Sequence, residues 1–509
     1  MRRVMVVAAL TAWCGLASTA RAQDPGVTVT DFDKKKGGSE KVHQLARVPA
    51  HEGAWKAADV ELEQDRNRPY AYLCGFVNFD FTIYDISNTS SPKQIFRWTI
   101  ENPELHRGIG AMDGKYFKIN GRYYYAQSLQ FMQGSPDADL GAVIFDVTGL
   151  PDPSKVKEVA RIRYPQSPGG FHNTFAYKHS DGRALYFATV NQSKALIYDL
   201  EKIVKGADPA TALIGEVPNP TPFRQIGGGG YHDFYVGYDP ATQQDKFYGA
   251  GLGGYSVWDV TKPETPKSLF TITSLGMDVA HTFTPSPDGR YAVTETEYQY
   301  TPLRIWDLEQ GQSGKTQNVD IPISAWTADW RDLSHNHEVR WPYVFVSAYE
   351  DGLQVFNLKD PKNPKTEGHF FTCECEHEHG FGGNPDNGWQ STTSVMQGAF
   401  GVDIRNYDGL VVLSDMRTGL WLFKVDGFNG WNGHDVGMPN ISSVQDWDRG
   451  PDKTWKAKVA SLRSSRAVRR GIAIVPKQGS AGTMQIPRCA RNDKAALGMT
   501  SCARNDNRL

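Results

Sequence analysis

The chain has 509 residues, of which 39% are hydrophobic and 12% aromatic, with 50 glycines and 29 prolines. This composition supplies a large core and many turns, and it excludes a wholly disordered chain. The formal net charge is −2, but setting aside the surplus of ten positive charges in residues 456–509 and three arginines in residues 1–22 leaves −15 for residues 23–455. An acidic body of this kind excludes nucleic acid as a partner, because phosphate binding requires a basic surface.

Residues 1–22 have the three parts of a secretory signal peptide. Two arginines precede an apolar run over residues 4–16, and Ala20-Arg21-Ala22 forms a small-x-small cleavage site. A lipid anchor on Cys14 is the alternative, which the bulky residue before it disfavours. No other stretch approaches the ~20 apolar residues of a membrane span. We therefore expect no membrane span and a periplasmic or extracellular location.

One short pattern recurs seven times in the body of the chain, and each copy has an aliphatic residue, an aromatic or apolar residue, an acid or its substitute, and a second aliphatic. The copies are Ile83–Ile86, Ile144–Val147, Ile197–Leu200, Val257–Val260, Ile305–Leu308, Val355–Leu358 and Leu422–Val425. They are 48 to 67 residues apart, close to the length of one propeller blade. Period-2 patterning and turn pairs such as Asp288-Gly289 indicate hairpins. The sequence therefore predicts an all-β fold over residues 42–435, a seven-bladed β-propeller of four-stranded antiparallel blades.

Val42–Val48, upstream of the first copy, has the pattern of an outer strand without a blade of its own. Since a propeller must close its ring, we expect this strand to complete the seventh blade, with residues 23–41 as an N-terminal extension. The alternative is a capping strand outside the propeller.

Three segments carry a resemblance to a known family: 350–364, 254–263 and 84–88, with sequences such as Asp351-Gly-Leu-Gln-Val-Phe-Asn-Leu358. They resemble the LVIVD-repeat family of secreted bacterial propellers over residues 42–425. The resemblance implies the propeller fold and little about chemistry. At the level of the fold the chain is also similar to methanethiol oxidase and selenium-binding propellers, which use histidines. Their double-histidine motif is absent here, so none of their catalytic residues is transferred.

In a propeller, the residues that open the innermost strands converge on one face beside the central channel. The histidines at these positions, from the third to the sixth unit, are His172, His232, His281, His335 and His337, and the other three units offer Asp59, Asp113 and Asp403. Imidazole is the commonest transition-metal ligand. We expect His172, His232, His281 and His337 to bind a metal, with His335 in reserve. The alternative is that these groups hydrogen-bond the strand starts and line a wet channel.

A second candidate metal cluster lies between the sixth and seventh units, on the same expected face. It consists of Cys373, Cys375, His377 and His379, which share one side of an extended segment. Thiolates and imidazoles are soft ligands that suit copper or zinc. The alternative is a disulfide, either to Cys74 or between the two cysteines, because the expected compartment is oxidising. A bond between cysteines so close together in sequence would be strained.

Motifs of other chemistry are missing. The glycines of 227–230 lack the lysine and helix of a phosphate loop, so no nucleotide cofactor is expected. Glu295 and Glu297 lie in a predicted strand and are expected to face solvent or a neighbouring blade rather than a sugar.

Two hypotheses about function follow from these patterns. The first is a secreted propeller that binds copper or zinc through its histidines and acts as a metal-dependent oxidoreductase on a small molecule. The second is a non-catalytic module of the cell envelope that presents its loop face to a protein or glycan. Three aromatic residues predicted to be exposed, Trp389, Phe428 and Trp431, would make such contacts.

The end of the chain, residues 436–509, has no strand or helix periodicity. Residues 456–509 hold twelve basic and two acidic residues, and Cys489-Ala-Arg-Asn-Asp493 is repeated at 502–506. We predict a disordered tail, with a basic interaction tail as the alternative.

Overall fold

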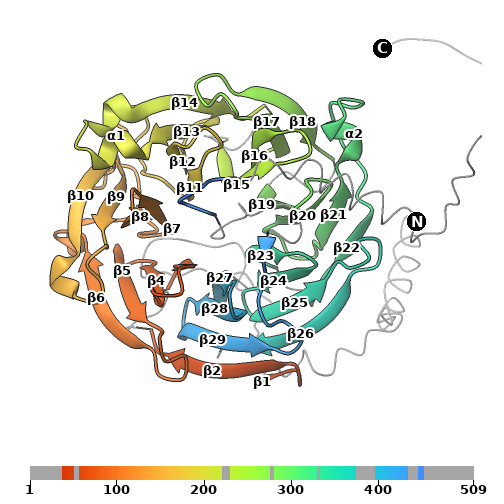
Figure 1. The fold of residues 1–509 in the computed structure, drawn as a ribbon, viewed down its shortest axis with the longest axis horizontal. Coiled ribbons are helices and arrows are strands. Elements are labelled where there is room, and N and C mark those ends of the chain that lie inside the picture. The colour runs from red at the N-terminus through yellow and green to blue at the C-terminus, as the bar shows by residue number, and fades with distance from the viewer. Residues whose placement is uncertain are drawn as a thin grey trace, which may run out of the picture. The chain divides into compact units, whose positions relative to one another are not determined.

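Seven antiparallel sheets stand in a ring around a common axis (Figure 1). The computed structural model describes residues 37–50, 57–220, 230–274, 280–329, 333–373, 396–433 and 445–451, all within one compact unit that spans residues 1–461. The predicted seven-bladed β-propeller is thereby confirmed.

Blades 1 to 3 each contain four strands, numbered outward from the axis. Blade 1 is β3 (Val60–Leu62), β4 (Tyr70–Gly75), β5 (Asp80–Asp85) and β6 (Lys93–Thr99). Blade 2 is β7 (Gly114–Ile119), β8 (Arg122–Ser128), β9 (Leu140–Asp146) and β10 (Lys157–Arg163). Blade 3 is β11 (Thr174–Lys178), β12 (Ala184–Thr189), β13 (Lys194–Asp199) and β14 (Leu213–Pro218).

Blades 4 to 6 repeat this order. Blade 4 is β15 (Tyr231–Asp239), β16 (Gln244–Gly251), β17 (Gly254–Asp259) and β18 (Lys267–Ile272). Blade 5 is β19 (Ala280–Pro285), β20 (Tyr291–Thr296), β21 (Leu303–Asp307) and β22 (Ser324–Trp326). Blade 6 is β23 (Asn336–Arg340), β24 (Tyr343–Ser347), β25 (Leu353–Asn357) and β26 (Lys365–Phe371), with the two-residue β1 (Gly37–Gly38) added at its outer edge.

Blade 7 joins the two ends of the ring. Its inner strands are β27 (Ala399–Arg405), β28 (Leu410–Asp415) and β29 (Gly419–Val425), and its outer strand is β2 (Val42–Val48). Val42 pairs with Val425 and Val48 with Leu420. The closing strand is therefore the predicted one, and the alternative of a capping strand outside the propeller is wrong.

The inner strands are buried on both faces because neighbouring blades pack face to face. All six residues of β4 and all seven of β9 are buried, so these strands read as continuous apolar runs. The outer strand β6 is mostly half-buried or exposed. Helices are short: α1 (Leu200–Val204), α2 (Glu309–Gln312) and the 3₁₀ turns η1 (Pro103–Leu105), η2 (Pro153–Lys155) and η3 (Pro209–Ala212). Neither α-helix of the described part has the length and apolarity to cross a membrane.

Seven residues of the predicted disordered tail, 445–451, pack on the inner strands of blades 2 and 3. The Trp447 ring is buried 6.3 Å from that of Phe117, between ring centroids. The Gln445 side chain accepts a hydrogen bond from the Lys178 backbone N–H and donates one to the Ala176 carbonyl. The prediction of disorder is therefore wrong for these residues, because a large aromatic side chain has apolar surface to bury. The other residues of the predicted tail, 436–444 and 452–509, lie outside the described residues.

Candidate metal site

A β-bulge opens the innermost strand pair in three blades. The extra, unpaired residue is His232 in blade 4, His281 in blade 5 and Phe400 in blade 7. Such a residue stands outside the ladder, so its side chain is free to point somewhere other than the pleat dictates. His172 and His335 lie just before β11 and β23. Four consecutive blades, 3 to 6, thus carry a histidine where their innermost strand begins.

Apolar residues occupy the same position in the other three blades. In blades 1, 2 and 3 the carbonyls of Asp59, Asp113 and Asn173 accept a backbone N–H from the second strand. The residues before them, Ala58 and Met112, are therefore the equivalents of His172. With Phe400 in blade 7, the ring of seven positions consists of four adjacent imidazoles and three apolar side chains.

The four imidazoles form one continuous arc. The ring centroids of His172 and His232 are 4.4 Å apart, those of His232 and His281 4.3 Å, and those of His281 and His335 4.6 Å. The prediction that histidines far apart in sequence meet at the axis is thus confirmed for these four residues.

Burial keeps the imidazoles uncharged. It lowers the pKa of His172 to about 4 and that of His335 to about 3. The pKa values of His232 and His281 are lowered well below the usual value, by burial first and by the neighbouring histidines second. A neutral imidazole is the form that binds metals.

These pKa values predict that His172 and His335 do not titrate between pH 5 and 8 in the metal-free protein. In a ¹⁵N-histidine NMR titration over that range, their ring signals are expected to stay those of neutral imidazole. His172→Gln and His335→Gln variants assign the two signals. A protonation midpoint near 6.5 for either signal would contradict the buried, neutral arc.

Neighbouring oxygen atoms fix the tautomers of two histidines. Nδ1 of His172 lies 2.6 Å from Gln130 Oε1, and Nδ1 of His335 lies 2.7 Å from the Phe400 carbonyl. Both oxygens only accept, so Nδ1 carries the proton and Nε2 keeps its lone pair. In His281, Nδ1 lies 2.9 Å from Thr282 Oγ1. Metal-bound histidines commonly hold their second nitrogen in this way.

Glu297, just beyond the end of β20, is a candidate ligand that the sequence did not single out. One donor atom each from His232, His281 and Glu297 lie within 4.8 Å of one another, and Glu297 Oε2 is 3.6 Å from His281 Nε2. Three ligands at 2.0–2.2 Å from one ion lie about 3.3–3.8 Å from one another in tetrahedral or trigonal geometry. Sub-ångström movements of the side chains would therefore bring these three atoms to a shared ion.

Glu297 and Glu295 both face the next blade, one of the two orientations expected from the sequence. Tyr349 donates a short hydrogen bond to Glu297 Oε1, and burial raises the pKa of Glu297 to about 7. The only hint in the sequence was the alternation that places Glu295 and Glu297 on one side of the strand.

His337 does not join the arc. Its Nδ1 lies 3.1 Å from Glu295 Oε2 of blade 5, and its ring lines a second cavity with Asn336. His335, predicted as the reserve ligand, takes the place predicted for His337. The reason is that His335 occupies the strand-opening position, whereas His337 is the second residue of β23.

The structure describes one member of the cysteine and histidine cluster. Cys373 is disulfide-bonded, which leaves no thiolate there for a metal. Cys74 is a free, buried thiol, so the predicted alternative of a disulfide to Cys74 is wrong. Cys375, His377 and His379 lie outside the described residues.

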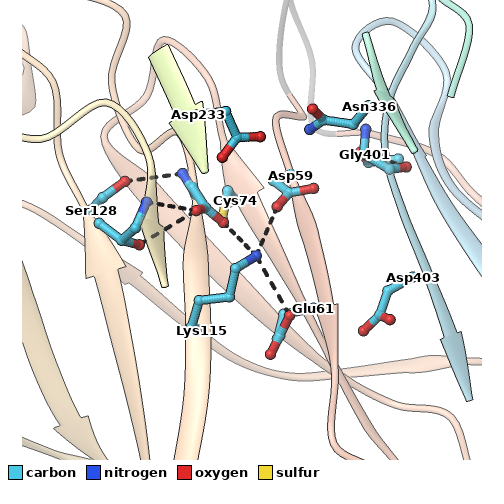
Figure 2. Close-up of polar contacts among 12 residues, drawn as sticks. Asp59, Glu61, Cys74, Lys115, Ser128, Asp233, Asn336, Gly401 and Asp403 are labelled. Carbon is cyan, nitrogen blue, oxygen red and sulfur yellow. Dashed lines mark hydrogen bonds and ion pairs between the residues drawn. The ribbon is translucent and has the colours of Figure 1, made fainter. Parts of the chain in front are cut away.

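The residues that follow the strand-opening positions in sequence line a second, small cavity of about 60 Å³. Figure 2 shows Lys115 of β7 there, pointing at the carboxylates of blade 1. Its Nζ lies 2.8 Å from Asp113 Oδ1, 3.2 Å from Asp59 Oδ2 and 3.6 Å from Glu61 Oε2. Asp59 and Asp113 lie one residue after the strand-opening positions expected for them, and they line this second cavity instead. In blade 7 the equivalent residue is Gly401, and Asp403 lies two residues further along β27.

Of the aromatic residues predicted to be exposed, Phe428 is buried and Trp431 is half-buried. The Phe428 ring is buried against Phe345, and the Trp431 indole N–H donates to the Trp341 carbonyl at 3.1 Å. The exposed contact surface predicted there is wrong for Phe428, because the chain after β29 folds back over blade 7. Trp389 lies outside the described residues.

The arc opens on a cavity of about 450 Å³, whose lining includes His172, His232, His335 and Glu297. Candidate ligand atoms and a space for a small molecule thus lie together. Comparison with known proteins adds no identity to this geometry: the chain matches no protein-family model and no curated protein.

Proposed function

We propose that this protein binds one transition-metal ion, copper or zinc, through His232, His281 and Glu297, with His172 and His335 beside it. The supporting residues are neutral imidazoles and a carboxylate, a donor set that suits both metals.

The observation that carries this proposal is a pair of unpartnered imidazole nitrogens. Among the described residues, neither His232 Nδ1 nor His281 Nε2 has a hydrogen-bond partner, although both atoms are buried. A buried polar atom left unpaired costs about 1–3 kcal/mol. An ion bound to these nitrogens would remove that cost, and His281 Nε2 is the nitrogen that lies 3.6 Å from Glu297 Oε2.

Oxidoreductase chemistry on a small molecule is the activity we propose for the site. A bound copper ion would supply one-electron redox chemistry, whereas zinc would supply Lewis acidity alone. The chain's own residues orient the imidazoles of the arc, which are held by Gln130, Thr282 and the Phe400 carbonyl. The Tyr349 hydroxyl, which donates a hydrogen bond to Glu297, places a proton beside the atoms that would bind the metal.

We also propose that the protein acts in the periplasm or outside the cell. The signal-peptide pattern of residues 1–22 supports this location. The disulfide at Cys373 supports it independently, because disulfides persist mainly in oxidising compartments.

Metal analysis of the mature protein, purified without a histidine tag, tests the proposed function. After incubation with copper or zinc and desalting, we expect one ion per chain by mass spectrometry of the metal content. The copper(II) form is expected to show nitrogen hyperfine splitting in its electron paramagnetic resonance spectrum. Folded protein that retains no ion of either metal would overturn the proposal.

A further inference from the structure

We infer that the 450 Å³ cavity beside the histidine arc binds a neutral, mainly apolar small molecule that carries an aromatic ring. This inference deepens the proposed function, since it names the class of substrate. Binding of the molecule does not depend on the metal site, but its role as a substrate rests on the proposed function.

The cavity has two chemically different walls. The imidazoles come from blades 3 to 6, whose side also contributes Val190, Tyr231 and Leu252, while the apolar wall comes mainly from blades 1, 2, 6 and 7. The apolar side chains of that wall include Phe76, Ile109, Met112, Phe131, Met396, Phe400 and Met416. Several of them, with Tyr349, belong to one apolar cluster. This division follows from the ring of strand-opening residues, where Met112 and Phe400 replace histidine.

Aromatic faces and edges continue from this wall to the imidazoles. The Phe400 ring stacks on His335 with centroids 3.7 Å apart, and Phe76 meets Phe400 edge to face at 5.6 Å. Offset and edge-to-face ring contacts favour a further aromatic ring beyond the gain from burial. The three methionine side chains add polarisable thioethers, which pack well against rings and adapt to their shape.

The charges of the lining disfavour an anionic ligand. No lysine or arginine is among the described residues that line the cavity, and its one acidic residue is Glu297. A carboxylate or phosphate would therefore enter without a positively charged side chain to replace its water, which costs several kcal/mol. Volumes of about 300–1,000 Å³ are typical of small-molecule sites, so a molecule of one or two rings fits.

Calorimetric titration of the mature, metal-free protein with benzyl alcohol tests the inference, and benzoate serves as the charged counterpart. We expect saturable binding of benzyl alcohol to one site and at least about tenfold weaker binding of benzoate. No saturable binding of benzyl alcohol, or equal binding of benzoate, would overturn the inference.

Ile109→Trp fills the cavity from the apolar wall. It is expected to weaken benzyl alcohol binding at least about tenfold. Ile321→Trp is the matched control, because Ile321 is 74% exposed and lies outside the cavity. It is expected to leave binding unchanged. Leu252→Trp, from the blade 4 side, repeats the test if Ile109→Trp does not fold, as judged by circular dichroism. Binding that survives in a folded cavity-filled variant would overturn the inference.

The metal-free titration separates this inference from the proposed function. Benzyl alcohol binding by a protein that takes up no metal would leave the cavity assignment standing and overturn the metal site. Metal uptake without benzyl alcohol binding would do the reverse.

Discussion

Replacing His281 with alanine is expected to lower the affinity for copper or zinc by at least about 100-fold. Loss of a residue that only hydrogen-bonds a ligand already lowers metal affinity 10–100-fold. His281 is central, because it lies between His232 and His335 and its Nε2 is 3.6 Å from Glu297 Oε2. Competition with a chelator of known affinity measures the change. The copper(II) spectrum is expected to lose nitrogen splitting in parallel.

Two further histidine variants make this test specific. His43→Ala, on the outer strand β2, removes a half-exposed imidazole paired with Asp426 and is expected to leave metal affinity unchanged. His337→Gln separates the ligand set seen in the structure from the one predicted by the sequence, and it too is expected to retain the metal. Metal retained by His281→Ala, or lost by His337→Gln in folded protein, would contradict the assignment.

Lys115→Met is expected to destabilise the propeller by about 3 kcal/mol at pH 7, because it leaves three carboxylates near the axis without their counter-ion. Asp59, Glu61 and Asp113 lie within 3.6 Å of Lys115 Nζ. Burial raises the pKa values of Asp59 and Glu61, and Lys115 opposes this rise. Urea unfolding of the variant and the native protein measures the difference.

The destabilisation by Lys115→Met is expected to shrink as the pH falls from 7 to 5. Carboxyls whose pKa is raised in the folded state bind protons on folding, so they destabilise as the pH rises above the unfolded value and are relieved as it falls. Removing the lysine raises these pKa values further. A difference that stays constant from pH 5 to 7 would show that lost packing, rather than lost charge, is responsible.

Lys118→Met provides the matched control on the same strand. Lys118 Nζ lies 2.7 Å from Asp448 Oδ2, whose side chain is 62% exposed. A solvent-screened pair of this kind contributes at most about 1 kcal/mol. An equal loss of stability in the Lys115 and Lys118 variants would contradict a special role for the buried cluster.

The fold could be predicted because each blade repeats a local signal. An aromatic residue followed by an acid or its substitute at the end of the third strand marks every blade, from Ile83–Ile86 to Leu422–Val425. Closure was also predictable, since Val42–Val48 has the strand pattern and no partner nearby in sequence. Residues 445–451 were missed because their contacts with β7 and β11 involve residues about 270 to 330 positions away.

The candidate site could be predicted only in part. Histidines near the strand starts indicated the four members of the arc, because blade symmetry brings such positions together. The choice between His335 and His337 required the structure, since period-2 alternation places both on the same side of an ideal strand. The bulges at His232 and His281 shift the alternation of side chains between the two faces by one residue, and nothing in the sequence marks where these bulges occur.

By itself, the sequence determined the number of blades, the closing strand and the face on which the histidines gather, because local patterning and radial repetition suffice for these features. Only the tertiary structure decided that Glu297 approaches His281, that His337 turns to Glu295, and that Lys115 meets three carboxylates. The physical reason is that these contacts join different blades, so they depend on how the sheets pack and where their bulges fall.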